Sequence, residues 1–489
     1  MRENFNAHLQ KSFYHIRGDV VDVESEWTMF KTSIVDAAAK SCGLRPVGAA
    51  MGGNPRTRWW TPTVREAVRS KKEAFRAMLG STSPEARERY RQAKRTAAKA
   101  VAEAKARAWE EFGEAMEKDH RTASKLFWQT IRRLRRGRRE TARVVLSKSG
   151  EPLTSNEDIV DRWKEHFEDL LNPLSAPSSM ETELECPERT DSITVAEVTT
   201  AVKALRRGKA AGVDEIRPEM LKALDAVGIA WLTRLFGVVW REGSTPLDWQ
   251  TGVVVPLFKK GDQRVCSNYR GITLLSIPGK AYARVLERRL RPMVEHRIQE
   301  EQCGFRPGRG TTDQLFSLSQ IFEGMWEYAQ PVYMCFVDLE KAYDRVPRGL
   351  LWGVLKEYDV PDPLRRAIRS LYSKSQSCVR VLGIKSKPFT VGVGLRQGCV
   401  LSPLLFMIFM DRISRRSRGS ESIRYGSLEV SSLLYADDVI LLASSVQDLQ
   451  RALERFAAEC EAAGMRISTS KSEIMVLSRK RVDCLLRVD

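Results

Sequence analysis

Acidic residues adjoin short apolar runs at two places in the second half of the chain. Asp338 directly follows the apolar run 333–337, and the adjacent pair Asp437 and Asp438 is flanked by apolar residues on both sides. Magnesium-assisted phosphoryl transfer needs hard oxygen ligands on rigid elements, around two ions about 3.5–4 Å apart. Each site alone has an ordinary explanation, because Asp is common in turns and at helix caps. The adjacent pair fits that explanation less well, since like charges repel unless a cation offsets them.

The elements around these acids are predicted from the apolar pattern. The continuously apolar run 333–337 is typical of a buried strand. Residues 433–442 predict a hairpin with its acids at the tip, and Ile467 and 474–477 could form further strands. A helix that stops near Gly464 should follow the hairpin. Its apolar face would comprise Leu449, Leu453, Phe456 and Cys460.

The charge balance favours a polyanionic partner. Lys and Arg number 80 against 62 Asp and Glu, so the 489-residue chain has a formal net charge of +18. Such an excess favours nucleic acid or an anionic surface. Membrane insertion is not expected, because the longest apolar stretch, 400–410, is too short to span a bilayer. The nine cysteines and five histidines are dispersed, which gives little support to a zinc site or a disulfide framework.

Composition divides the first part of the chain. Residues 1–61 are interpreted as an N-terminal linker segment, 62–140 as a basic helical region, and the Pro-containing stretch 141–190 as a linker. The basic region ends in an arginine cluster that is either a solvated face or an RNA contact. The arginines predicted to bind nucleic acid are Arg132, Arg133, Arg135 and Arg136.

Several segments occur in an order that a known family shares. Those resembling the palm motifs of reverse transcriptases are Cys335–Asp344, Leu395–Pro403 and Tyr435–Asp438. Those resembling the fingers motifs of LINE-type enzymes are Gly208–Asp214, Phe258–Asp262 and Asn268–Leu275. Gly304–Gln314 resembles the segment that joins fingers to palm, and Gly464–Lys471 resembles the motif after the catalytic hairpin. From about residue 190 onward, the chain therefore resembles the reverse transcriptase of a non-LTR retrotransposon.

The resemblance implies an α+β fold, the fingers and palm of a right-hand polymerase. The palm would be an antiparallel sheet with packed helices, and the basic α-helical region would precede the fingers. The implied boundaries are fingers at 191–330 and palm at 331–489, with a reverse transcriptase core at about 240–489. The family also has an upstream endonuclease and a downstream thumb, which are not recognised here. We therefore expect a fragment that extends primers weakly or not at all.

The implied activity is that of an RNA-directed DNA polymerase, in which a primer 3′-hydroxyl attacks the α-phosphate of a dNTP. The partners would be an RNA template, a DNA primer and dNTPs, in an intracellular ribonucleoprotein of the nucleus or cytoplasm. The implied ligands of Mg²⁺, for which Mn²⁺ could substitute, are Asp338, Asp437, Asp438 and the carbonyl of Leu339. The implied nucleotide-binding residues are Lys259 and Arg270 at the triphosphate, Tyr343 beneath the sugar, and Gln397 and Gly398 near the nucleotide and template. Lys471 would protonate the leaving pyrophosphate.

Three alternatives remain open. A group II intron maturase shares the YADD sequence, but 259–262 followed by 268–275 favours a LINE element. A catalytically silent nucleic-acid-binding remnant would keep the same motifs, and primer extension compared with RNA retention separates it from a polymerase. A basic helical scaffold explains only residues 62–140.

Overall fold

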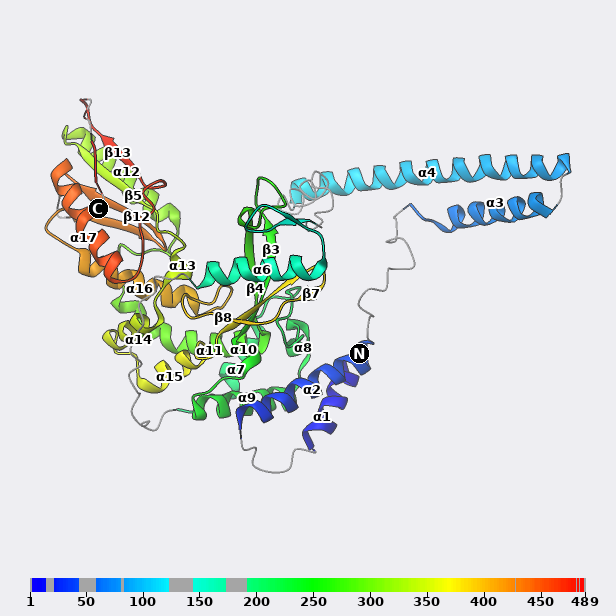
Figure 1. Cartoon of the computed structure of the whole chain (residues 1–489), viewed down its shortest axis with the longest axis horizontal. Helices are drawn as coiled ribbons and strands as arrows, with labels where there is room; N and C mark the ends of the chain where they lie inside the picture. Colours follow the sequence, from blue (N-terminus) through cyan, green and yellow to red (C-terminus); the bar gives the residue numbers. More distant parts are fainter. Residues whose placement is uncertain are drawn as a thin grey trace. The chain divides into compact units, whose positions relative to one another are not determined.

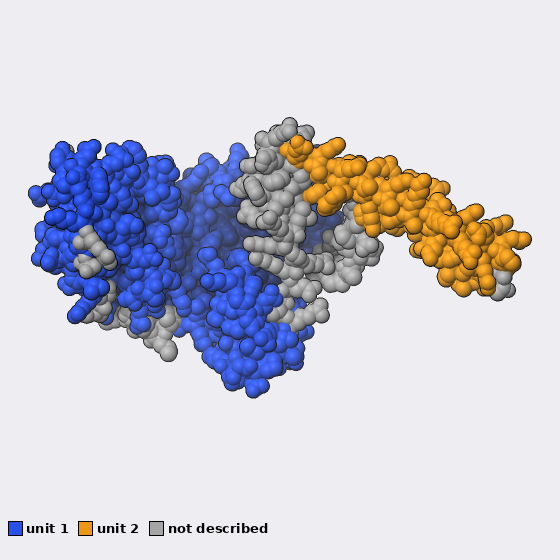
Figure 2. Space-filling view, turned by 90° about the horizontal axis from the view of Figure 1, so that it is seen from above, with its two compact units in different colours: residues 1–43, 142–489 blue, residues 44–141 orange. Residues whose placement is uncertain are grey.

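The structure is a computed structural model of the chain, and it forms two compact units. One unit comprises residues 1–43 and 142–489, and the other comprises 44–141 (Figure 2). The residues that the structure describes are 2–14, 22–43, 59–80, 83–122, 144–172, 191–426, 428–480, 482 and 484–487.

The smaller unit is a pair of helices, α3 (Pro62–Gly80) and α4 (Pro84–Thr122), which lie side by side (Figure 1). Small and branched apolar residues face the contact, where Val64, Ala97 and Ala104 are buried. Basic and acidic side chains occupy the exposed positions, as an amphipathic helix pair in water requires. The arginine cluster Arg132, Arg133, Arg135 and Arg136 lies outside the described residues.

The prediction that residues 1–61 form a linker segment is corrected by two helices, α1 (Arg2–Tyr14) and α2 (Val23–Cys42). Both contact α9 (Ala226–Glu242). The buried side chains of α2 recur at helical spacing, so that one face of the helix is apolar. On that face, Phe30 meets Trp231 edge to face at 5.3 Å between ring centroids. The buried residues with this spacing are Val23, Trp27, Phe30 and Ile34.

The predicted linker at 141–190 is also corrected in its described part. Residues 144–172 form a two-stranded hairpin followed by helix α6, which Ser155 caps by accepting a hydrogen bond from the Asp158 N–H. Trp163 of this helix is buried and lies 4.8 Å from the ring of Tyr269. Burial of such large aromatic surfaces makes the segment part of the folded unit. The bounds are β1 (Val145–Leu146), β2 (Pro152–Leu153) and α6 (Asn156–Leu171).

A first sheet has the strand order β4-β3-β6-β7, with β8 also paired to β6. Its strands are β3 (Thr251–Phe258), β4 (Tyr269–Leu274), β6 (Gln376–Val381), β7 (Ile384–Lys385) and β8 (Phe389–Thr390). Strand β3 pairs antiparallel with β4 and parallel with β6. The predicted boundaries are thereby corrected, because residues 376–390, assigned to the palm at 331–489, join the sheet of the predicted fingers. Helix α6 covers this sheet (Figure 1).

A second sheet has the strand order β11-β12-β5-β13 and is antiparallel throughout. Its strands are β5 (Val332–Val337), β11 (Ser432–Tyr435), β12 (Asp438–Ala443) and β13 (Glu473–Leu477). Alternate residues of β5 belong to two different cores. Tyr333, Cys335 and Val337 share a core with α16 (Ser402–Ser417) and α17 (Val446–Ala462). Val332 and Met334 share the other with α12 (Thr311–Glu327).

This sheet confirms the predicted buried strand, the hairpin and the following helix. The four residues predicted for one face of that helix, Leu449, Leu453, Phe456 and Cys460, are the buried residues of α17. After α17 the chain turns at Gly464, whose φ is 71°. Ile467 then forms an isolated bridge with Leu339, beside the predicted strand β13. The described chain is thus α+β, as predicted.

The remaining elements precede β3 or lie between the strands of the two sheets. They are α7 (Val195–Lys203), α8 (Pro218–Ala223), α10 (Leu247–Gln250), α11 (Ile277–Val294), α13 (Ala342–Arg345), α14 (Arg348–Glu357), α15 (Asp362–Ser370), β9 (Ile423–Tyr425), β10 (Leu428–Val430) and the short 3₁₀ turns η1 (Cys266–Asn268) and η2 (Glu295–Arg297). Within the described ranges, each helix is too short or too polar to cross a membrane.

Candidate active site

The structure places the three predicted acids at one end of the second sheet. Asp338 directly follows β5, and Asp437 lies in the two-residue turn between β11 and β12. Val337 pairs with Val439 in the antiparallel ladder, so the next position of each strand is Asp338 and Asp438. Residues opposed in this way point to the same face of a sheet. Carboxylates from segments about a hundred residues apart therefore meet on rigid strand ends.

The acids repel one another, and this repulsion contributes to a raised pKa at Asp438. Partial desolvation raises the pKa of the Asp438 carboxyl although its side chain is exposed, and the charges of Asp437 and then Asp338 raise the pKa further. Lys471 supplies a compensating charge, with its Nζ 3.2 Å from Oδ1 of Asp338. The site thus has an excess of negative charge that a cation would offset.

The backbone around Asp338 is held by the loop that carries Lys471. The Asp338 N–H donates to Ser472 Oγ at 3.2 Å, and the Asp338 carbonyl accepts from the Ser468 N–H at 2.8 Å. Leu339 and Ile467 lie opposite each other in an antiparallel bridge. The hydrogen bonds of this bridge are made by the residues on either side of Leu339, which are Asp338 and Glu340. In such a pair the carbonyl of Leu339 faces away from its partner strand. The Leu339 carbonyl therefore makes no hydrogen bond in this bridge.

The chemistry of these donors fits a hard divalent cation, for which carboxylate and carbonyl oxygens are the preferred ligands. In the arrangement described, however, Asp338 faces the Lys471 ammonium. Among the described residues, no three Asp, Glu, His or Cys side chains converge closely enough to hold one ion. Lys471 thus supplies the cation that faces Asp338 in this arrangement.

Tyr343 lies beside the acids on the short helix α13. Its ring stacks on Phe406 at 4.3 Å and 16°, and Phe305 approaches its edge at 6.2 Å. Burial raises the pKa of the Tyr343 hydroxyl, and the charge of Asp437 raises it further. The hydroxyl is buried and has no hydrogen-bond partner within the described residues. Tyr343 is thus a rigid aromatic wall whose polar end faces the acidic turn.

Gln397 and Gly398 lie in a turn that reaches the same helix. The Gln397 Nε2 donates to Asp344 Oδ1 at 2.7 Å. Gly398 has φ 82°, and an added Cβ would lie 3.3 Å from the carbonyl oxygen of Thr273 in β4. Only glycine adopts this φ without strain while approaching a neighbouring strand so closely. The turn therefore contacts both helix α13 and the first sheet.

Lys259 and Arg270 lie on the hairpin of β3 and β4 and are exposed. Arg270 pairs with Leu257 across the ladder, and the Lys259 N–H donates to the Asn268 carbonyl at 2.9 Å. Burial raises the pKa of Asp344, while the Gln397 hydrogen bond and the charges of Lys341 and Arg270 oppose that rise. The charge of Arg270 thus acts on Asp344, the residue that accepts a hydrogen bond from Gln397. The hydrogen bond given above for Lys259 lies within its own hairpin.

A small cavity lies between the first sheet and this turn. Its lining includes Gly252, Thr273 and Gln376 from the sheet and Asp344 and Gln397 from the opposite side. The walls carry backbone, amide and carboxyl groups together with the aliphatic side chains of leucine and valine. Sites for small polar ligands commonly combine apolar walls with a few polar groups.

Comparison with known proteins assigns the segment that contains the acids. Residues 258–485 match the family described as reverse transcriptase (RNA-dependent DNA polymerase). This segment is a reverse transcriptase domain. It contains the acidic sheet end, the Tyr343 wall, the Gln397 turn, and the residues Lys259 and Arg270.

Relatives of the reverse transcriptase domain come from transposons. The Xenopus laevis protein named transposon TX1 uncharacterized 149 kDa protein is 28% identical over 366 residues, which are 72% of this chain and 28% of the relative. The probable RNA-directed DNA polymerase from transposon BS of Drosophila melanogaster is 28% identical over 318 residues, 63% of this chain and 34% of the relative. The reverse transcriptase domain is thus similar to proteins named for mobile elements. The chain spans about a third or less of the length of these two relatives.

A solved telomerase structure from Candida tropicalis, truncated from its C-terminal domain, aligns with a TM-score of 0.36 and 12% identity. The alignment covers 48% of this chain and 51% of the telomerase.

Three residues that shape the site of the reverse transcriptase domain were not among the site residues predicted from the sequence. Gln302 is buried, and its side-chain oxygen accepts from the Ala436 N–H at the acidic turn. Phe305 meets Tyr343, and Ser472 holds Asp338. Gln302 and Phe305 lie in or beside the segment resembling the fingers-to-palm connection, which could have drawn attention to them. Their partners lie far away in sequence, so local periodicity carries no signal of these contacts.

Proposed function

We propose that the chain is an RNA-directed DNA polymerase of a non-LTR retrotransposon, which transfers nucleotides from dNTPs to a primer 3′-hydroxyl on an RNA template. The observation that carries the proposal is the meeting of Asp338 with Asp437 and Asp438 at one sheet end within a reverse transcriptase domain. In this proposal the second sheet serves as the palm and the first as the fingers. The work would take place in a ribonucleoprotein in the nucleus or the cytoplasm.

The acids and Leu339 are the residues proposed to hold divalent cations. Asp338, Asp437 and the Leu339 carbonyl would bind Mg²⁺ or Mn²⁺, with Asp438 in support. Bound ions of this kind would supply Lewis acidity to the attacking hydroxyl and to the leaving pyrophosphate. Lys471 would leave Asp338 on ion binding, and its ammonium could then donate a proton to pyrophosphate. The exposed position of Lys471, 65% for its side chain, leaves it free to move.

The remaining predicted residues are proposed to position the nucleotide and the template. Lys259 and Arg270 would hold the triphosphate, because exposed cationic donors bind phosphate oxygens well. Gln397 and Gly398 would lie against the nucleotide and template, with Gln397 oriented by Asp344. Outside the described residues, Arg132, Arg133, Arg135 and Arg136 would neutralise RNA phosphates.

Single-nucleotide incorporation tests the proposal on this chain. Enzyme in excess over a DNA primer annealed to RNA should add the first templated dNTP when Mg²⁺ or Mn²⁺ is present. Chelation of the ions should stop the reaction. Because the enzyme is in excess and only one nucleotide is added, the result does not depend on how long the chain retains the primer–template duplex. RNA binding without incorporation under either metal would overturn the proposal and support a silent nucleic-acid-binding remnant.

Replacement of Tyr343 by Val tests its proposed position beneath the sugar. Tyr343 is held between Phe406 and Phe305, so its ring would meet a 2′-hydroxyl at a fixed place. We expect Tyr343→Val to lower the preference for dNTP over the matching ribonucleotide by about tenfold or more. Single-turnover rates for the two substrates measure this ratio. Tyr333→Val, in the buried strand β5, controls for loss of aromatic packing. An unchanged ratio with normal dNTP use would assign Tyr343 to packing alone.

A further inference from the structure

The turn that carries Asp437 has an unfavourable backbone. Tyr435 pairs with Asp438, so Ala436 and Asp437 alone connect the two strands. Ala436 has φ 63°, in the left-handed region that a Cβ disfavours. Glycine is the residue usually found where a two-residue hairpin turn needs positive φ. Contacts from outside the hairpin must therefore stabilise this conformation.

Gln302 makes such a contact. Its Oε1 accepts from the Ala436 N–H at 3.1 Å and from the Gly304 N–H at 2.8 Å. The side chain is 1% exposed, so water does not compete for the acceptor. Its Nε2 has no hydrogen-bond partner within the described residues. The oxygen, and not the amide nitrogen, is therefore the functional part of this side chain.

The loop around Gln302 is fastened directly to the hairpin. The Cys303 N–H donates to the Leu434 carbonyl, and the Leu434 N–H donates to the Glu301 carbonyl, both at 2.9 Å. Gln302 and Leu434 thus form a parallel bridge beside the acidic turn. A loop paired to β11 in this way holds the Gln302 side chain at a fixed distance from Ala436.

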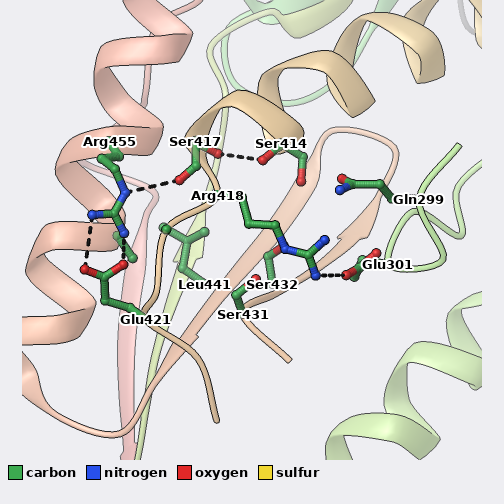
Figure 3. A pocket seen from close by; sticks show the side chains of 12 residues that line it. Gln299, Glu301, Ser414, Ser417, Arg418, Glu421, Ser431, Ser432, Leu441 and Arg455 are labelled. Atoms are coloured by element: carbon green, nitrogen blue, oxygen red, sulfur yellow. Dashed lines mark hydrogen bonds and ion pairs between the residues drawn. The ribbon is translucent and has the colours of Figure 1, made fainter. Parts of the chain in front are cut away.

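The same loop is braced from its other side. The Arg306 guanidinium donates to the carbonyls of Gln299 and Gln302 at 3.0 and 3.2 Å. The buried Asp411 of α16 accepts from the Gln299 N–H at 2.8 Å. Figure 3 shows Arg418, just past α16, reaching Glu301 across a pocket at the base of the hairpin, with a hydrogen bond of 2.8 Å. The loop is therefore a rigid support for the turn.

We infer that Gln302 is a positioning residue that holds Ala436 in its left-handed conformation and thereby fixes the direction of the Asp437 carboxylate. Only the expected effect of Gln302 on catalysis rests on the proposed function. The contact with the turn exists independently of any activity. Gln302 touches no reacting group and acts through the backbone of the turn.

A double-mutant cycle with Gln302→Met and Ala436→Gly tests this role. Met keeps the volume of Gln302 but removes the acceptor, and Gly adopts positive φ without strain. Gln302→Met should lower kcat for single dNTP addition by on the order of tenfold to a hundredfold, with the KM for dNTP little changed. In the Ala436→Gly background the same change should have an effect at least about fivefold smaller. An equal loss of kcat in both backgrounds, or no loss in either, would overturn the inference.

Amide hydrogen exchange gives a readout that does not depend on activity. Peptides covering 433–442 should exchange faster in Gln302→Met than in the parent, because the Ala436 N–H loses its acceptor. Gln320→Met, on the exposed face of α12, should leave exchange there unchanged. If the parent chain incorporated no nucleotide, the proposed function would fail and this measurement alone would decide the inference. Unchanged exchange in Gln302→Met would refute it.

Discussion

Replacement of Asp437 by Asn should lower single-nucleotide incorporation by about a thousandfold or more, or about 4 kcal/mol of transition-state stabilisation. Asp437 lies at the tip of a short hairpin, and its charge contributes to the raised pKa of Asp438. Asn keeps the shape of the side chain but removes the charge and one of the oxygens that a hard cation needs. RNA binding should persist, because the exposed basic surface is unchanged.

The matched control is Asp36→Asn, which makes the same chemical change at an exposed position of α2. Incorporation should stay at the parent rate in this control. Rates are measured with enzyme in excess, and RNA retention is measured by filter binding on the same preparations. Comparable incorporation by Asp437→Asn and the parent would remove Asp437 from the site.

Replacement of Gly304 by Ala should lower incorporation by roughly a hundredfold, because a displacement near 1 Å at reacting groups has an effect of that size. An added Cβ at residue 304 would lie 2.2 Å from the Ala436 nitrogen and 2.8 Å from its Cα. Both atoms are backbone, so no side chain can rotate away to relieve the contact. The acidic turn or the loop that supports it must shift.

Gly353→Ala is the matched control for that change. Gly353 lies in helix α14, and an added Cβ there meets nothing within 4 Å. This control should keep parent activity and gain slightly in thermal stability, because Ala favours a helix over Gly. Thermal unfolding of both variants separates a local shift from global unfolding. Parent-like incorporation by Gly304→Ala would mean that the close contact between the loop and the turn does not set the geometry of the site.

Features that depend on local pattern were predicted well from the sequence. The run 333–337 is a strand, and the four apolar positions of α17 form its buried face. Both predictions use side-chain periodicity, which burial on one face of an element imposes directly. The acids could be predicted as a group because their motifs follow a known order. The contacts of Asp338 with Lys471 and Ser472 required the fold.

Features that depend on distant pairing were missed. Strand β6 pairs parallel with β3, which lies more than a hundred residues earlier, and nothing in the local pattern distinguishes it from a palm strand. The linker prediction for 1–61 gave too much weight to its turn-rich end and too little to the helical spacing of Trp27, Phe30 and Ile34. Gln302 is a polar residue in a loop, and its importance comes from a hydrogen bond across 134 positions of sequence.

The contact between Lys471 and Asp338 means that the acidic sheet end carries its own tethered counter-ion. Both side chains are partly open to water, at 65% and 39%, so the pair contributes on the order of 1 kcal/mol or less. That is enough to ease repulsion among the acids, and too little to keep the proposed divalent ion away from Asp338. If a divalent ion binds there as proposed, it would replace the lysine at Asp338 and leave the ammonium beside the substrate.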